Sequence, residues 1–271
     1  MRFTIDIEIK GEPPFLLPVN YRRNVIALIK ELMKSCDFSQ HEYNSYWGDS
    51  NNNIAKPYTF FLYIPDAKHI FIDGKKFLRL NFPLIKLYVS TNDPRFISIL
   101  YNGFLKIRKS FFMFDYPIEL KEFFISKVKS IDSDSAEFKI LSPVLVRNIS
   151  LEGHRKNFKG YLSCYNSFFN ESLIQSIITL CRHFLSYKPD SDEIGIDISG
   201  CRIVRIPHYH ELVPATKGII GIKARKDILE LIYNIGLGAR RSQGFGMVDL
   251  AKEAKDVCSN SDLVANELAT G

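Results

Sequence analysis

Four glycines near the end of the chain frame a short run of polar and basic residues. The segment reads Gly236-Leu-Gly238-Ala-Arg240-Arg241-Ser242-Gln243-Gly244-Phe-Gly246. Glycine permits positive φ and a close approach of the backbone to a ligand. Backbone N–H groups in such a loop can bind phosphate oxygens, and arginine can reach phosphates or base edges with two hydrogen bonds. The spacing therefore indicates a nucleic-acid contact, with a tight helix-to-strand connection carrying two exposed arginines as the alternative.

Two other glycine-rich motifs do not fit this segment. A dinucleotide fingerprint requires a strand before the glycines and a helix after them, whereas here a helical pattern precedes them and an expected strand at 247–250 follows. A P-loop requires Gly-Lys-Ser or Gly-Lys-Thr, which the segment lacks. The motif is therefore not that of a nucleotide cofactor, and we expect no cofactor.

A second group of cations lies on the first expected helix, residues 21–35. At about 100° per residue, Arg23, Lys30 and Lys34 fall within roughly 40° of one another, opposite an apolar face. A solvated face of an amphipathic helix is the ordinary explanation for such charges. All three have the same sign, however, which also fits a surface that binds RNA.

A third basic segment has the sequence Glu-Gly-His-Arg-Lys-Asn-Phe-Lys-Gly and includes His154, Arg155 and Lys156. We interpret it as a loop or hairpin edge that suits an RNA backbone, with a plain surface turn as the equal alternative. His208 and His210 lie two residues apart and would share one face of a strand. No further ligands accompany them, and the carboxylates are scattered, so the sequence predicts no metal site.

The elements between these segments alternate in a regular order. Helical periodicity appears at 21–35, from 93, from 170 and at 225–234. Strands are expected at 1–10, 58–63, 69–72, 76–89, 111–114, 136–146, 194–206, 218–222 and 247–250. Each half thus reads strand, helix, two or more strands, helix, strand. This order predicts an α+β protein with two tandem ferredoxin-like (βαββαβ) domains, at 1–125 and 126–250, and a flexible tail at 251–271.

Composition agrees with a packed protein that has a polyanionic partner. The chain has 271 residues, 46% of them hydrophobic, and a formal net charge of +6. No apolar run is long enough to span a bilayer, and the start alternates as a strand does. We therefore expect a cytoplasmic protein without a membrane partner. The five cysteines are dispersed, which fits packing better than disulfides or zinc.

At the glycine-rich segment the sequence resembles the CRISPR repeat-processing endoribonucleases of the RAMP superfamily. Gly-Leu-Gly-Ala-Arg-Arg-Ser-Gln-Gly-Phe-Gly-Met-Val matches their signature without departure, and other features follow in the family's order over residues 1–250. These features are the opening strand, Pro18-Val-Asn-Tyr21, the segment beginning at Lys56-Pro-Tyr, Leu141-Ser-Pro-Val and the helix from Asn170.

The resemblance implies two ferredoxin-like domains and a cut within each CRISPR repeat that needs no metal. The ribose 2′-OH attacks the adjacent phosphorus, leaving a 2′,3′-cyclic phosphate and a 5′-OH. The family places a histidine after the first helix and a lysine further on, which correspond here to His41 and Lys56. Lys30 stands near the helix position where the family often has a tyrosine, and Tyr43 or Tyr46 is an alternative for that role.

The resemblance also implies the partners, namely CRISPR repeat RNA and its precursor. Subunits of a CRISPR effector complex and a second copy of the chain remain open as further partners. A non-catalytic RNA-binding RAMP subunit is the competing function, because the same loop occurs in RAMP proteins that do not cut. A protein-interaction module that uses the aromatic surface is a third, more distant class.

Overall fold

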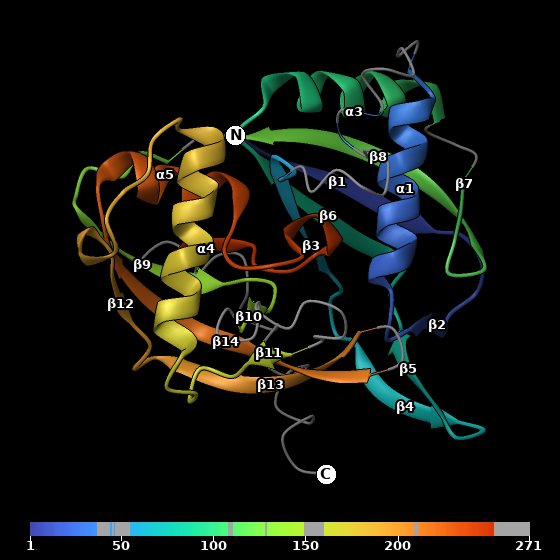
Figure 1. The fold of residues 1–271 in the computed structure, drawn as a ribbon. Coiled ribbons are helices and arrows are strands. Elements are labelled where there is room, and N and C mark those ends of the chain that lie inside the picture. The colour runs from blue at the N-terminus through green and yellow to red at the C-terminus, as the bar shows by residue number, and fades with distance from the viewer. Residues whose placement is uncertain are drawn as a thin grey trace. The chain divides into compact units, whose positions relative to one another are not determined.

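The computed structural model describes residues 1–36, 44, 46, 55–107, 111–127, 129–148, 160–208 and 211–251. The chain divides into two compact units (Figure 1). Unit 1 contains Met1–Tyr58 and Leu62–Val128, and unit 2 contains Thr59–Phe61 and Lys129–Ser259. The architecture is mixed α and β with antiparallel sheets, as the sequence predicts at this level.

Unit 1 is built on a five-stranded sheet in the order β3-β6-β1-β8-β7. Its strands are β1 (Arg2–Ile9), β3 (Tyr58–Tyr63), β6 (Leu84–Thr91), β7 (Phe111–Met113) and β8 (Tyr116–Ser126). The alternation of Phe3, Ile5, Ile7 and Ile9 buries one face of β1, since successive side chains point to opposite faces of a sheet. The predicted first strand is thus confirmed as the centre of this sheet.

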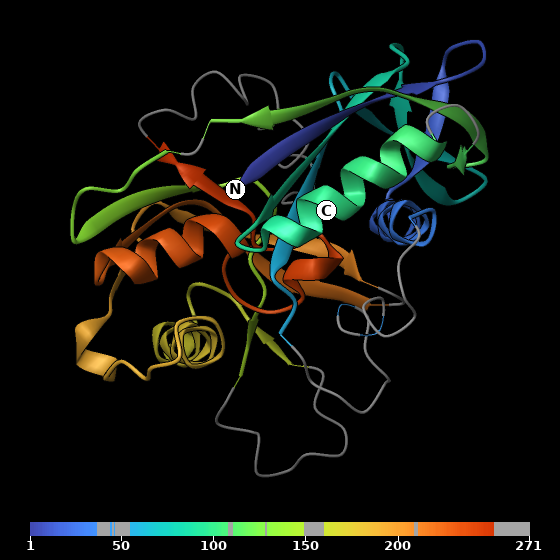
Figure 2. The same ribbon diagram turned by 90° about the horizontal axis from the view of Figure 1, so that it is seen from above.

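Helices α1 (Arg22–Lys34) and α3 (Pro94–Ile107) pack side by side in unit 1 (Figures 1 and 2). Leu28 and Leu32 are fully buried on the apolar face of α1. A Cβ atom at Gly103 of α3 would lie 1.9 Å from the carbonyl oxygen of Leu32. The helices can therefore approach this closely only because position 103 has no side chain.

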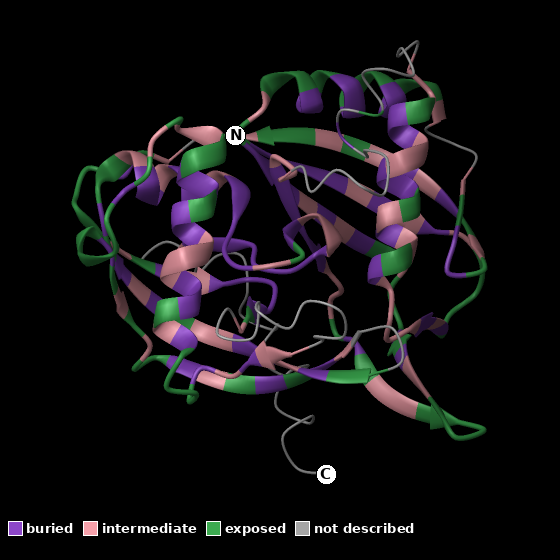
Figure 3. Ribbon diagram, viewed as in Figure 1, coloured by how far each residue is buried: buried purple, intermediate pink, exposed green. Residues whose placement is uncertain are grey.

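A separate three-stranded sheet in the order β2-β5-β4 also belongs to unit 1. It contains β2 (Phe15–Pro18), β4 (Lys68–Ile72) and β5 (Lys75–Leu80). Asp73 and Gly74 connect β4 to β5 with φ of 49° and 74°. Two positive φ angles in a two-residue turn match the right-handed twist of a hairpin, which explains the Asp-Gly pair. Figure 3 shows the tip of this hairpin as exposed.

Unit 2 is built on a sheet in the order β12-β14-β9-β15, with β13 also paired to β14. Its strands are β9 (Ser135–Ile140), β12 (Gly195–Asp197), β13 (Cys201–His208), β14 (Glu211–Lys223) and β15 (Val248–Leu250). A two-stranded ladder joins β10 (Val146–Arg147) to β11 (Tyr161–Leu162). Helices α4 (Phe169–Phe184) and α5 (Lys226–Ile235) and short 3₁₀ turns at Ser191–Glu193 and Arg241–Gln243 complete it.

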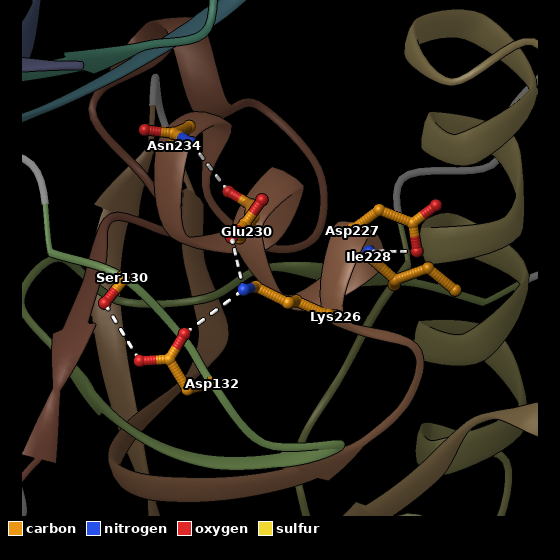
Figure 4. A network of polar contacts seen from close by, with 7 residues as sticks. All are labelled: Ser130, Asp132, Lys226, Asp227, Ile228, Glu230 and Asn234. Atoms are coloured by element: carbon orange, nitrogen blue, oxygen red, sulfur yellow. Dashed lines mark hydrogen bonds and ion pairs between the residues drawn. The ribbon is translucent and has the colours of Figure 1, made fainter.

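The helices of unit 2 close the larger of its two apolar clusters against the sheet. Phe138 of β9, Ile177 of α4 and Ile228 of α5 are all fully buried in it. Figure 4 shows how the start of α5 is tied to the segment before β9, where Lys226 Nζ lies 3.1 Å from Asp132 Oδ1. Both side chains are more than half exposed, so this ion pair adds little stability. The core packing therefore fixes α5 and, with it, the start of the glycine-rich segment.

Several sequence expectations about the strands were wrong in detail. The expected strand 76–89 is two strands, β5 and β6, because residues 81–83 bend between them and Pro83 cannot donate to a ladder. Strand β8 was not expected, although Ile118 and Leu120 alternate inward along it. The first helix was expected to begin at residue 21, whereas Tyr21 is the N-cap of α1 and the helix begins at Arg22.

Candidate nucleic-acid interface

The glycine-rich segment follows α5 and precedes β15, as the sequence predicts. All four glycines adopt positive φ, namely 81° at Gly236, 71° at Gly238, 84° at Gly244 and 71° at Gly246. A Cβ atom at Gly246 would lie 1.9 Å from the carbonyl oxygen of Leu237, and one at Gly244 would lie 2.5 Å from the ring of Phe60. The glycines are therefore required by close approaches inside unit 2.

The backbone amides of this segment donate within the protein. Gly246 N–H donates to the Pro143 carbonyl at 2.9 Å, and Ala239 N–H donates to the Leu145 carbonyl at 2.7 Å. Leu237 N–H donates to the carbonyl of Gly246 itself at 2.8 Å. The expected phosphate cradle is therefore not formed by these amides. The four glycines, Gly236, Gly238, Gly244 and Gly246, are buried and hold the segment against residues 143–145 and against Thr59 and Phe60, which also belong to unit 2.

Arg241 is a structural residue in this fold. Its side chain is buried, with 7% exposure, and its Nη1 donates to the Ile235 carbonyl at 2.9 Å. Burial lowers the pKa of its guanidinium to about 10. The expectation that both arginines contact RNA is therefore wrong for Arg241, since its guanidinium binds the last carbonyl of α5 and is removed from solvent.

Arg240 points the other way and is exposed. It adopts a left-handed conformation with φ of 59°, and its Nε donates to the Tyr161 hydroxyl at 3.3 Å. Tyr161 pairs with Arg147 across the β10–β11 ladder. We call Arg147, Tyr161 and Arg240 the Arg240 cluster. Ser242 and Gln243, which follow Arg241 in the sequence, were also predicted to bind RNA. Both are half-buried.

The predicted basic segment with His154, Arg155 and Lys156 connects β10 to β11 in the chain. It lies outside the described residues. The strands β10 and β11, which flank it in sequence, carry Arg147 and Tyr161 of the Arg240 cluster. The sequence did not single out Arg147 or Tyr161, because only the pairing of β10 with β11 places them beside Arg240.

In unit 1, the structure brings together Lys30 of α1 and Lys56, which lies just before β3. Lys56 is half-buried, and its pKa falls to about 8, first because burial disfavours the charged amine and second because the charge of Lys30 repels it. A phosphate near these amines would reverse both penalties by supplying the missing negative charge. The pair therefore suits an anion that bears developing charge.

The remaining predicted residues of unit 1 are distributed as follows. Arg23 and Lys34 are exposed on α1, on either side of the half-buried Lys30 along the helix. His41 and Tyr43, the candidates for proton transfer, lie outside the described residues. Tyr46 was the alternative tyrosine. Its hydroxyl donates a hydrogen bond to the carboxylate of Asp93 within unit 1.

The described residues contain no group of three or more His, Cys, Asp or Glu side chains that could hold a metal ion. His210 lies outside them, and only the backbone of His208 is described. No helix in the part of the chain that the structure describes is long and apolar enough to cross a membrane.

Comparison with known proteins finds similarity to CRISPR-associated proteins. Residues 124–250 match the family model described as CRISPR associated protein Cas6, C-terminal. A CRISPR-associated endoribonuclease-like protein Cas6 of Pyrococcus furiosus is 22% identical over 174 residues, which cover 62% of this chain and 69% of the relative.

Solved structures share the fold over nearly the whole chain. A Cas6-related protein from Pyrococcus furiosus superposes with a TM-score of 0.76 at 21% identity, covering 93% of this chain and 99% of that one. A RAMP protein that binds different RNA substrates gives a TM-score of 0.74 at 21% identity, covering 92% and 99%. The chain therefore shares its fold with these two proteins.

Residues 124–250 thus match the Cas6 C-terminal family model, and the likeness to Cas6 proteins extends beyond these residues in fold. This finding confirms the resemblance to the repeat-processing family that the glycine-rich segment and the order of motifs indicate.

Proposed function

We propose that this chain is an endoribonuclease that binds the repeat of a CRISPR precursor RNA and cuts within it. The observation that carries the proposal is the half-buried Lys56, whose pKa is lowered to about 8 by burial and by the charge of Lys30. Functional sites are where burial and like charges shift pKa values in this way. The Pyrococcus relative is named as an endoribonuclease-like Cas6 protein, which agrees with this activity.

The proposal includes a fold of two tandem ferredoxin-like domains. In a ferredoxin-like sheet the first and third strands are central and the fourth and second lie outside. In unit 1, β8, β1, β6 and β3 follow that order, and in unit 2 β15, β9, β14 and β12 do. The sheet orders thus support one βαββαβ motif in each unit.

The reaction proposed is an internal transesterification. The 2′-oxygen of one ribose bonds to the adjacent phosphorus while the bond from phosphorus to the 5′-oxygen breaks. A base removes the 2′-OH proton and an acid gives a proton to the leaving 5′-oxygen, which yields a 2′,3′-cyclic phosphate and a 5′-OH. The chemistry needs no metal, because protonated lysines can stabilise the charge that develops on the phosphoryl oxygens.

The roles assigned to the residues follow their chemistry. His41 is proposed to transfer a proton, since histidine titrates near neutrality, and Tyr43 to assist it. Lys56 and Lys30 are proposed to stabilise the phosphorane. Arg23 and Lys34 on α1, the Arg240 cluster and the segment 154–156 are proposed to bind the RNA backbone away from the cut.

The decisive experiment is incubation with repeat RNA from the host's own array in the presence of EDTA, followed by analysis of the fragment ends. We expect fragments with a cyclic phosphate and a 5′-OH, and a severe loss of cutting in His41→Ala with RNA binding retained. His183→Ala, an exposed histidine of α4, is the matched control and should cut normally. Loss of cutting in EDTA would contradict the mechanism.

A non-catalytic RNA-binding subunit is the second candidate function. The exposed cations on α1 and in the Arg240 cluster favour RNA binding whether or not a proton is transferred. This alternative predicts tight repeat binding and no product at high protein concentration. Failure to bind RNA at moderate salt would instead favour a protein-interaction module.

A further inference from the structure

The β4–β5 hairpin of unit 1 has a large excess of positively charged over negatively charged side chains. Between residues 68 and 80 it has four cations, Lys68, Lys75, Lys76 and Arg79, against a single carboxylate, Asp73. Lys68 lies directly opposite Arg79 on the ladder. Like charges in directly opposite positions destabilise an antiparallel pair, so this arrangement weakens the isolated hairpin.

Three of these four cations have no ion-pair partner among the described residues. Lys68, Lys75 and Arg79 are exposed, and their side chains form no ion pair with any described residue. Lys68, Arg79 and Lys75 lie on one face of the hairpin. Lys75 is four residues from Arg79 along β5, toward the turn, which separates the two residues by roughly 13 Å. This face therefore offers positive charge at both ends to a ligand that has several negative charges in a row.

An aromatic ring occupies the other face at the tip. Phe71 is 70% exposed, and its cross-strand partner Lys76 places Nζ 5.6 Å from the centre of its ring. A large apolar side chain that is exposed to this extent gains little stability from packing inside the protein. An unpaired base can stack on such a ring, and the adjacent cation then lies close to the nucleotide.

We propose that the β4–β5 hairpin is a second RNA-contacting arm, which binds an unpaired stretch of the transcript. Lys68, Arg79 and Lys75 contact its phosphates, and Phe71 stacks on one of its bases. The inference rests on the proposed RNA-binding function and adds a site to it. An acidic protein would be held by the cations, but the exposed ring beside Lys76 fits a base better than a carboxylate.

Two variants of the full chain separate the contribution of the phosphate contacts from that of base stacking on Phe71. The double variant Lys68→Gln/Arg79→Gln removes two phosphate contacts, whereas Phe71→Leu retains an apolar side chain but removes the aromatic face. The probe is the host repeat RNA, extended by an unstructured flank, with Kd measured over a range of salt concentrations. Arg182→Gln, an exposed arginine on α4, is the matched control.

We expect the double variant to reduce the slope of log Kd against log salt by about 1.4, at roughly 0.7 per phosphate of a single strand. Phe71→Leu should weaken binding about fivefold or more, with the salt slope unchanged. Lys75→Gln gives an independent measure at the turn, with about half the slope change of the double variant. Arg182→Gln should bind as the wild type does.

The failure of this inference is distinguishable from the failure of the proposed function. If the wild type binds RNA and all the hairpin variants bind with the same affinity and slope, the arm is overturned while RNA binding stands. If the wild type binds no RNA, the proposed function itself fails. If the variants lose affinity for an acidic protein but not for RNA, the hairpin serves a protein partner and the inference is overturned.

Discussion

Arg241 and Arg240 are adjacent in sequence but lie in opposite environments. Arg241 donates from its buried guanidinium to the last carbonyl of α5, 2.9 Å away, whereas Arg240 is exposed and donates to the hydroxyl of Tyr161. One arginine therefore stabilises the fold of the glycine-rich segment, and the other is available to a ligand.

The two arginines should consequently respond differently to substitution. Arg241→Ala is expected to lower the free energy of unfolding by about 2 kcal/mol, because a charged hydrogen bond is lost and a carbonyl is left unpaired. Arg240→Ala should leave stability within about 0.5 kcal/mol of the wild type. Urea unfolding of both variants measures the difference. Equal losses of stability would contradict the assignment.

Arg240→Ala should instead act on RNA binding. Removing one phosphate contact is expected to weaken binding of the repeat and to reduce the slope of log Kd against log salt by about 1. Binding measured at several salt concentrations tests this expectation, with Arg182→Gln as the control. An unchanged slope would remove Arg240 from the proposed RNA surface.

The glycines of the segment allow a matched pair of substitutions. Gly246→Ala would place a Cβ atom 1.9 Å from the Leu237 carbonyl, whereas Gly74→Ala at the hairpin turn has nothing within 4 Å, although both positions have positive φ. Gly74→Ala should therefore cost only about 1 kcal/mol of backbone strain. Gly246→Ala should cost clearly more, since backbone must also move. Chemical denaturation compares the two, and similar costs would show that the close approach is unimportant.

The pKa of Lys56 predicts a dependence of stability on pH. The folded protein releases this proton at about pH 8, while the unfolded chain holds it to the ordinary lysine value of 10.5. Because the unfolded state binds more protons between these values, stability attributable to Lys56 rises as pH increases from 8 to 10.5. Lys56→Met should lack this rise, which partial exposure limits to about 1 kcal/mol.

Urea unfolding of the wild type and Lys56→Met at pH 7.5 and pH 10 measures that difference directly. Other groups titrate over the same range, so the relevant quantity is the change in the gap between the two proteins. A constant gap would show that Lys56 has an ordinary pKa.

The charge of Lys30, on α1, should lower the pKa of Lys56. Lys30→Gln removes a like charge and is expected to raise the pKa of Lys56, but not to the ordinary lysine value, because burial is the larger cause of the shift and remains. The side-chain ¹⁵N signal of Lys56 followed by NMR over a pH series reports it. Lys34→Gln, on the same helix but exposed, is the control. If the pKa of Lys56 were the same in Lys30→Gln as in the wild type, the charge of Lys30 would have no effect on Lys56.

Periodicity and turn chemistry in the sequence were enough to predict α1 and α5 to within one residue at each end, the starts of α3 and α4 to within one residue, and β3 with the bounds observed. These elements are local patterns, with an apolar face every three or four residues or every second residue. The glycine-rich segment was likewise placed correctly between a helix and a strand, because its neighbours have strong local patterns.

Tertiary packing decided which side chains of that segment reach solvent. Nothing local distinguishes Arg240 from Arg241. Their environments differ because Arg241 meets the end of α5, while the β10–β11 ladder carries Tyr161 to Arg240. The lowered pKa of Lys56 likewise arises from burial and from a charge on another element, and no pattern along the chain encodes either.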